Sequence, residues 1–262
     1  MTLPASFIKA GYLPPDKVRG KVRHLLIGTD GWDNTGKTEF ALSAPGPGIV
    51  ICLDRGFDSV FDNPKPPKTR RDDFAFKVIK TPLPTQLTQP EYIAQWKAFY
   101  EEYKAALANP DARTVVLDGD SDSWELQRLA EFGRTTQVPS LQYPNVNAAR
   151  KAMIARAWDS GKIVISTNKL EVEYETKIND KGKDVQVKTG RERRQGFRDW
   201  TYLYNVHLRH LRNTDTGEFG VRILMAKADT SLAGLELWGE DCNFQSVVQT
   251  IYPNVPLSEW GY

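Results

Sequence analysis

Long apolar runs are scarce in this chain of 262 residues, and the longest extends only from Ile49 to Leu53. A helix that spans a membrane needs about 20 consecutive apolar residues, so we expect no membrane partner. Residues 1–12 lack the apolar core of a signal peptide. Cys52 and Cys242, the two cysteines, cannot form a disulfide framework or a four-ligand zinc site. These absences predict a cytoplasmic protein with reduced cysteines.

An excess of one charge is also missing from the whole chain, which has 35 Lys and Arg against 33 Asp and Glu. The positive charges are nevertheless segregated. Residues 1–24 contain five basic side chains and one acidic one, and residues 177–198 contain eight basic and three acidic ones. The rest of the chain is therefore net negative. A local basic segment favours contact with nucleic-acid phosphates even in a nearly neutral chain.

The order of the expected elements favours an α/β fold. Hydrophobic residues make up 40% of the chain and charged residues 26%, as is ordinary for a globular protein. Up to about residue 170, strands alternate with helices, which predicts βαβ units and a mostly parallel sheet flanked by helices. The strands of this part are expected at residues 23–29, 49–54, 74–81, 114–118 and 162–167, and helices at 37–43, 91–107 and 146–158.

Two hairpins are expected after the alternating part, with turns at residues 179–182 and 214–217. The strands of these hairpins are expected at residues 171–178, 184–188, 202–212 and 219–226. We expect them to be antiparallel additions to one edge of the sheet at the C-terminal end of the chain. Residues 1–22, with their three prolines, are expected to form an extended basic arm before a single domain of residues 23–262.

A phosphate-binding pattern, G-x-x-x-x-G-K-[ST], begins at Gly31. Its glycines let successive backbone N–H groups point at phosphate oxygens, and the helix that follows directs its positive end at the same anion. In this pattern the lysine contacts the β- and γ-phosphates, and the last hydroxyl binds Mg²⁺. A plain Gly-rich turn between a strand and a helix is the alternative. We predict eight nucleotide-binding residues: Gly31, Trp32, Asp33, Asn34, Thr35, Gly36, Lys37 and Thr38.

Asp118 ends a buried strand, Thr-Val-Val-Leu-Asp, and a parallel strand in this position ends beside the phosphate-binding loop. Asp118 is therefore predicted to hold the magnesium ion together with Thr38. Asp54 and Asn168 end two further strands at the same edge. Asp54 is predicted to position the attacking water, and Asn168 to sense the γ-phosphate. The alternative for Asp54 is a charged residue that only marks the end of a strand, and the alternative for Asn168 is a polar cap.

A basic hairpin that leaves the same edge is a plausible path for a nucleic-acid backbone. Tyr143, Tyr174 and Phe197 offer rings on which single-stranded bases can stack. The alternative is a solvated surface hairpin. The predicted DNA-binding residues are Lys177, Lys181, Lys183, Lys188, Arg191, Arg193, Arg194 and Arg198.

The sequences of residues 31–38, 49–54 and 115–128 resemble those of phage-encoded RecA-like P-loop ATPases. These are compact AAA-type nucleotide-binding proteins that include phage single-strand annealing recombinases. The resemblance extends over roughly residues 22–230. It implies a RecA-like P-loop NTPase core that binds ATP and Mg²⁺ and self-associates into a ring or a filament.

The same resemblance implies action on single-stranded DNA in phage recombination or replication, in the cytoplasm of the infected bacterial host. A phage single-strand binding protein is a further implied partner. Lys227 resembles a basic residue that, in related assemblies, reaches the γ-phosphate of a neighbouring subunit. The family's catalytic Glu is replaced by the sequence Asp54-Arg55-Gly56, so Asp54 would have to serve.

We therefore expect an ATPase with Lys37, Asp118, Asp54, Asn168 and Lys227 as its catalytic residues. Two other functions remain open. One is a P-loop small-molecule kinase, in which the arginines of residues 188–198 would form a lid over the phosphates. The other is a nucleotide-dependent assembly protein with little turnover, which the missing Glu favours.

Overall fold

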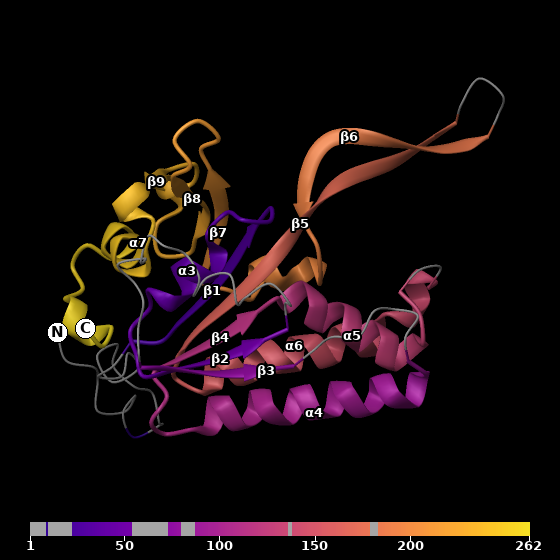
Figure 1. Cartoon of the computed structure of the whole chain (residues 1–262), viewed down its shortest axis with the longest axis horizontal. Coiled ribbons are helices and arrows are strands. Elements are labelled where there is room, and N and C mark those ends of the chain that lie inside the picture. The colour runs from indigo at the N-terminus through magenta and orange to yellow at the C-terminus, as the bar shows by residue number, and fades with distance from the viewer. Residues whose placement is uncertain (1–8, 10–22, 54–72, 80–86, 136–137, 179–182) are drawn as a thin grey trace.

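A central sheet of nine strands organises the described residues, which in this computed structural model are Lys9, 23–53, 73–79, 87–135, 138–178 and 183–262 (Figure 1). The strand order is β3-β2-β4-β5-β1-β7-β8-β9, and β6 pairs with β5. The strands are β1 (Leu25–Gly31), β2 (Gly48–Cys52), β3 (Phe74–Val78), β4 (Thr114–Asp118), β5 (Ile163–Ile178), β6 (Asp184–Arg194), β7 (Val206–Arg212), β8 (Phe219–Ala226) and β9 (Glu236–Trp238).

Most pairings in the sheet are parallel. Strand β1 pairs in parallel with β5 and β7, β2 with β3 and β4, and β4 with β5. The pairs β5·β6, β7·β8 and β8·β9 are antiparallel. The predicted mostly parallel sheet with antiparallel additions is therefore confirmed. The expectation that both hairpins extend one edge was wrong, because β7 joins the interior parallel sheet and β6 pairs with β5 in the middle of the strand order.

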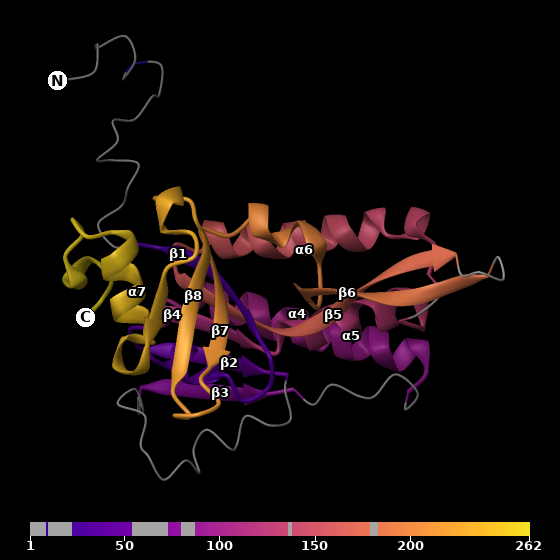
Figure 2. The same cartoon turned by 90° about the horizontal axis from the view of Figure 1, so that it is seen from above.

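Helices cover both faces of the sheet (Figures 1 and 2). One face carries α4 (Gln89–Ala108), α5 (Asp120–Phe132) and α6 (Pro144–Asp159), and the other carries α3 (Lys37–Leu42) and α7 (Phe244–Ile251). The short 3-10 helices are η2 (Ser140–Gln142), η3 (Arg198–Tyr202), η4 (Thr230–Leu232), η5 (Gly239–Asp241) and η6 (Leu257–Glu259). No helix among the described residues is both long and apolar enough to cross a membrane.

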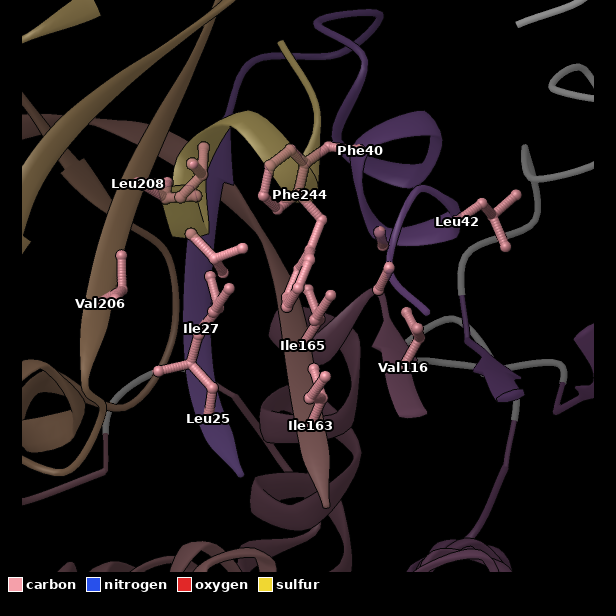
Figure 3. Packing of buried hydrophobic residues seen from close by; sticks show 14 of the residues in the cluster. Leu25, Ile27, Phe40, Leu42, Val116, Ile163, Ile165, Val206, Leu208 and Phe244 are labelled. Atoms are coloured by element: carbon pink, nitrogen blue, oxygen red, sulfur yellow. The ribbon is translucent and has the colours of Figure 1, made fainter. Parts of the chain in front are cut away.

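Successive side chains of each strand point to opposite faces of the sheet, so a separate apolar cluster lies on each face. Leu25 and Ile27 of β1 join the cluster under α3 and α7, whereas Leu26, between them, joins the cluster under α4, α5 and α6. Figure 3 shows Phe40 of α3 and Phe244 of α7 above β1 and β5. Because both faces of the central strands are buried, the ends of these strands are held firmly where the loops begin.

Helix α4 begins with a capping box and presents the predicted aromatic stripe to the core. The backbone N–H of Thr88 donates to a carboxylate oxygen of Glu91 at 2.7 Å, which satisfies a donor at the helix start. Tyr92, Phe99 and Tyr103 are each no more than 1% exposed. The sequence-based interpretation of this stripe as core is therefore confirmed.

Strand β5 is longer than the sequence pattern predicts. Residues 162–167 and 171–178 were expected to be two strands, but β5 is continuous over sixteen residues. Its first part is buried in the sheet, and its last five residues are exposed in the hairpin with β6, which projects beyond the helices (Figures 1 and 2). Pairing with β6 from Leu170 onward keeps the backbone extended after β5 leaves the sheet. The predicted turn at 179–182 lies outside the described residues.

Candidate nucleotide-binding site

The predicted phosphate-binding loop joins β1 to α3, the expected strand and helix, and its backbone curls sharply. Asn34 has a φ of 57° and Gly36 a φ of 81°, both in the left-handed region. A Cβ atom at Gly36 would lie 2.8 Å from the Cγ of Phe219, so glycine is required there by space as well as by conformation. Successive residues of this kind form a concave nest of N–H groups that suits an anion.

The side chains of the loop hold its backbone in this curled shape. The Lys37 ammonium donates to the carbonyl oxygens of Gly31 at 3.0 Å and of Trp32 at 2.7 Å. The Thr35 hydroxyl donates to the same Trp32 carbonyl at 2.7 Å. The lysine therefore lies across the loop, on the side where the pattern places the phosphates. Asp33 and Trp32 are exposed at its rim.

Thr38 and Asp118, the two predicted magnesium ligands, are in contact. The Thr38 hydroxyl lies 3.0 Å from both carboxylate oxygens of Asp118. Thr167, in the buried first part of β5, donates to Asp118 Oδ1 at 2.8 Å and accepts from the backbone N–H of Gly119 at 2.9 Å. A hydroxyl beside a carboxylate at a strand end is a hard oxygen pair that fits Mg²⁺ bound to phosphates.

Thr167 was missed in the sequence analysis, although it precedes Asn168 on the same strand. Like Asn168, it is a polar residue at the same edge of a parallel strand, so it carries the same signal. Thr167 orients the Asp118 carboxylate toward Thr38 and ties β5 to β4 at that edge.

Asn168 is buried, and the hydrogen bonds of its amide are directed at the protein. Its Nδ2 donates to the carbonyl oxygens of Thr29 at 3.2 Å and of Ser166 at 3.3 Å. Its Oδ1 accepts from Arg194 Nη1 at 3.0 Å. The predicted role as a donor to the γ-phosphate would require these bonds to change.

Arg194, one of the predicted DNA-binding residues, lies in the protein rather than on the outer face of the hairpin. Its guanidinium lies 3.7 Å from the ring centroid of Trp200 and also donates to the Phe197 carbonyl. Burial lowers the pKa of this guanidinium to about 9. Arg194 therefore links the base of the hairpin to Asn168, which pairs with Asp30 directly before the loop.

The other described basic residues of the hairpin lie farther out along it. Lys183, Lys188 and Arg191 are exposed. Lys177 pairs with Glu175 at 2.8 Å, and Arg193 pairs with Glu171 at 2.7 Å. Lys181 and the side chain of Arg198 lie outside what the structure describes.

A buried carboxylate, Asp30, lies directly before the phosphate-binding loop and was not predicted. Its Oδ2 accepts from His207 Nε2 at 2.8 Å, and its Oδ1 forms an ion pair with Arg209. Burial alone would raise the pKa of Asp30, but the contacts with His207 and Arg209 outweigh it and keep the pKa below its usual value. Because these partners are 177 and 179 residues away in sequence, only the pairing of β7 with β1 brings them together.

The hairpin touches the phosphate-binding loop through Glu192. One carboxylate oxygen of Glu192 accepts from the indole N–H of Trp32 at 2.7 Å, and the other accepts from Arg209 at 3.3 Å. Trp32, Glu192, Arg209 and Asp30 therefore form a chain of contacts from the rim of the loop to the buried end of β1.

Lys227 lies near the N-terminal ends of the parallel strands, whereas the phosphate-binding loop follows the C-terminal end of β1. Ala226, the residue before it, pairs with Val206 at the N-terminal end of β7, and β7 runs parallel to β1. The Lys227 ammonium donates to the Tyr202 carbonyl at 2.7 Å and lies 5.8 Å from the Trp158 ring centroid. It therefore cannot reach the loop of its own chain. Asp54, the predicted water-positioning residue, lies outside the described residues.

No protein-family model matches this chain, and no curated protein sequence is similar to it. Solved structures do match, and one of them is a crystal structure of the RadB recombinase. The two chains are 12% identical; the match covers 83% of this chain and 87% of that chain, with a TM-score of 0.44. Values this low assign neither a family nor a function. The mostly parallel sheet flanked by helices is the α/β architecture expected for a RecA-like core.

Proposed function

We propose that this chain binds and hydrolyses ATP with Mg²⁺ and uses the nucleotide to control its binding to single-stranded DNA. The observation that carries the proposal is the contact of Thr38 with Asp118 at 3.0 Å beside the curled loop. The loop supplies the anion-binding backbone and the lysine, and this contact supplies the oxygen ligands that a nucleotide-bound metal requires.

Each residue of the site would have a definite task. Lys37 would exchange the carbonyl oxygens of Gly31 and Trp32 for the β- and γ-phosphate oxygens of ATP, where its charge stabilises the transition state. Thr38 and Asp118 would hold Mg²⁺, which supplies positive charge to the phosphate oxygens when bound. Asp54 would position the attacking water, and Asn168 would sense the γ-phosphate.

Self-association follows from the place of Lys227 within this proposal. Since Lys227 lies at the edge of the sheet opposite its own loop, it could contact a γ-phosphate only in a second copy of the chain. Two copies stacked so that opposite edges meet would supply that contact, and repetition of the contact would generate a ring or a filament.

The projecting hairpin would supply the DNA contacts. Its exposed residues Lys183, Lys188 and Arg191 are well placed for a flexible, salt-dependent interaction with phosphates. The chain of contacts from Glu192 to Trp32 would transmit the state of the loop to this hairpin, because Lys37 shares the Trp32 carbonyl. We place the activity in phage recombination or replication, as the sequence resemblance implies.

A steady-state ATPase assay with and without single-stranded DNA tests the proposal. We expect hydrolysis that DNA stimulates, and a loss of at least about 100-fold in the Lys37→Ala variant, since a stabilising charge at the phosphates is removed. Lys97→Ala is the matched control, because Lys97 is exposed on α4. Lys37→Ala activity equal to that of the wild type would refute the assignment of the site.

Two measurements beside the ATPase assay, phosphate transfer to an added nucleoside and equilibrium ATP binding, separate the two other functions. Transfer of phosphate to an added nucleoside, with no response to DNA, would identify a small-molecule kinase. Tight ATP binding without measurable turnover would identify a nucleotide-dependent assembly protein.

A further inference from the structure

A pocket of about 690 Å³ lies at the base of the hairpin, apart from the phosphate-binding loop. Helix α5 forms one wall, Thr135, Val138 and the start of α6 a second, and the end of β6 with the chain after it a third. Its volume falls within the range of about 300–1,000 Å³ that is usual for small-ligand sites.

Three aromatic side chains are part of the lining: Tyr143 is partly buried, and Trp124 and Phe197 are buried. The ring centroids of Trp124 and Tyr143 are 6.4 Å apart in a stacked arrangement, and those of Trp124 and Phe197 are 5.6 Å apart. The guanidinium of Arg128 lies 5.7 Å from the Tyr143 ring centroid. Aromatic rings and guanidinium planes are the surfaces on which unpaired bases stack in proteins that bind single strands.

The charges of the pocket are mixed. Its lining includes three arginines, and Glu125, Glu171 and Asp199 oppose them. A cluster of phosphates would meet these three carboxylates and is disfavoured. A neutral heterocycle with donors and acceptors on its edges suits such a lining, and the buried Nε of Arg128 has no hydrogen-bond partner among the described residues.

Residues that line the pocket also contact residues near the phosphate-binding loop. Arg194, which lines the pocket, donates to Asn168 at 3.0 Å. Ser121, which follows Asp118 by three residues, donates to the Gln195 carbonyl at 2.7 Å and accepts from the Lys169 backbone N–H at 3.0 Å. A ligand in the pocket would therefore contact groups that hold β5 at Asn168 and Lys169, beside the helix that follows β4.

We propose that this pocket receives an unstacked nucleobase of the bound single strand, while the outer hairpin holds the phosphates. The inference rests on the proposed DNA binding and adds a specific site for the base to it. An aromatic side chain of a protein would be a similar size, but the lysines of the adjoining hairpin favour a polyanion whose rings hang from a phosphate chain.

The test compares two oligonucleotides of equal length, oligothymidylate and an abasic strand with the same phosphates. We expect the wild-type protein to bind oligothymidylate about 5- to 150-fold more tightly, the range for stacking of one base. Tyr143→Leu keeps an apolar side chain at the partly buried position and removes the ring, so this preference should be lost. Lys97→Gln, on the exposed face of α4, should keep it.

A second variant separates the pocket from the backbone contacts. Lys177→Gln on the outer hairpin should weaken binding of both oligonucleotides by the same factor and leave their ratio unchanged. Equal binding of both strands by the wild type, or a full preference in Tyr143→Leu, would overturn the pocket and leave the proposed function standing. Failure to bind either strand would overturn both proposals.

Discussion

His210 should make the stability of this protein depend on pH in a range where few other groups titrate. The side chain is 1% exposed and lies against Phe40, with a ring-centroid distance of 5.2 Å. Burial is the main cause that lowers the pKa of His210 to about 3; the Lys37 charge lowers it as well, and Asp30 opposes both. A histidine in an unfolded chain has a pKa of about 6.5.

The direction of the change in stability follows from the pKa of His210 in the folded and in the unfolded chain. As the pH falls below about 6.5, His210 takes up a proton in the unfolded chain but stays neutral in the folded one, so the unfolded state gains stability. The contribution of His210 is thus complete above about pH 6.5 and is lost progressively toward pH 3. Since each pKa unit corresponds to about 1.4 kcal/mol, the folded state should lose roughly 2 kcal/mol between pH 8 and pH 5.

Urea denaturation at pH 8 and pH 5 measures this loss as a change in the free energy of unfolding. His210→Phe retains a ring against Phe40 and removes the titrating group, so its loss should be smaller by roughly 2 kcal/mol. His24→Gln, at an exposed position, should behave like the wild type. Equal losses in the wild type and in His210→Phe would refute the reasoning.

Two further predictions concern the backbone of the loop and a buried ion pair between Asp120 of α5 and Arg150 of α6. Gly36→Ala should abolish nucleotide binding in an equilibrium binding assay. It should also lower the free energy of unfolding by more than the roughly 1–2 kcal/mol of left-handed strain, because its Cβ would meet Phe219 at 2.8 Å. Gly217→Ala, with a φ of 74° and nothing within 4 Å of its Cβ, should show the strain alone. Arg150→Met should lower the free energy of unfolding by about 3–5 kcal/mol, since the Asp120 carboxyl, at 3% exposure, would lose the cation that compensates its burial. Adding Asp120→Asn should recover much of that loss in urea denaturation, and a purely additive double variant would argue against coupling of the pair.

The parts of the site that are local in sequence could be predicted, and the parts made by distant strands could not. The loop at residues 31–38 carries its own turn, lysine and hydroxyl, so a short pattern is enough to find it. Asp118 is found because a buried strand ends there. Asp30 and Arg209 are 179 residues apart on different strands, and nothing in either segment marks the other as its partner.

The length of β5 likewise could not be predicted from local sequence patterns. Residues 162–167 and 171–178 each have strand character, but the residues between them include Asn168 and Lys169, which interrupt the pattern. They stay extended because β1 pairs with Asn168 and Lys169 and β6 pairs with Leu170. Pairing partners, rather than local propensity, therefore decide where this strand ends.

The continuity of β5 is what makes coupling between nucleotide and DNA physically reasonable. The strand carries Thr167, which holds Asp118, and then enters the hairpin without an intervening loop. The second arm of the hairpin returns Glu192 to the rim of the nucleotide loop. A shift of the loop on nucleotide binding would therefore act on both arms of the hairpin at its base. Because coupling is reciprocal, the proposed function requires that DNA held by the hairpin change the affinity for nucleotide by the same factor.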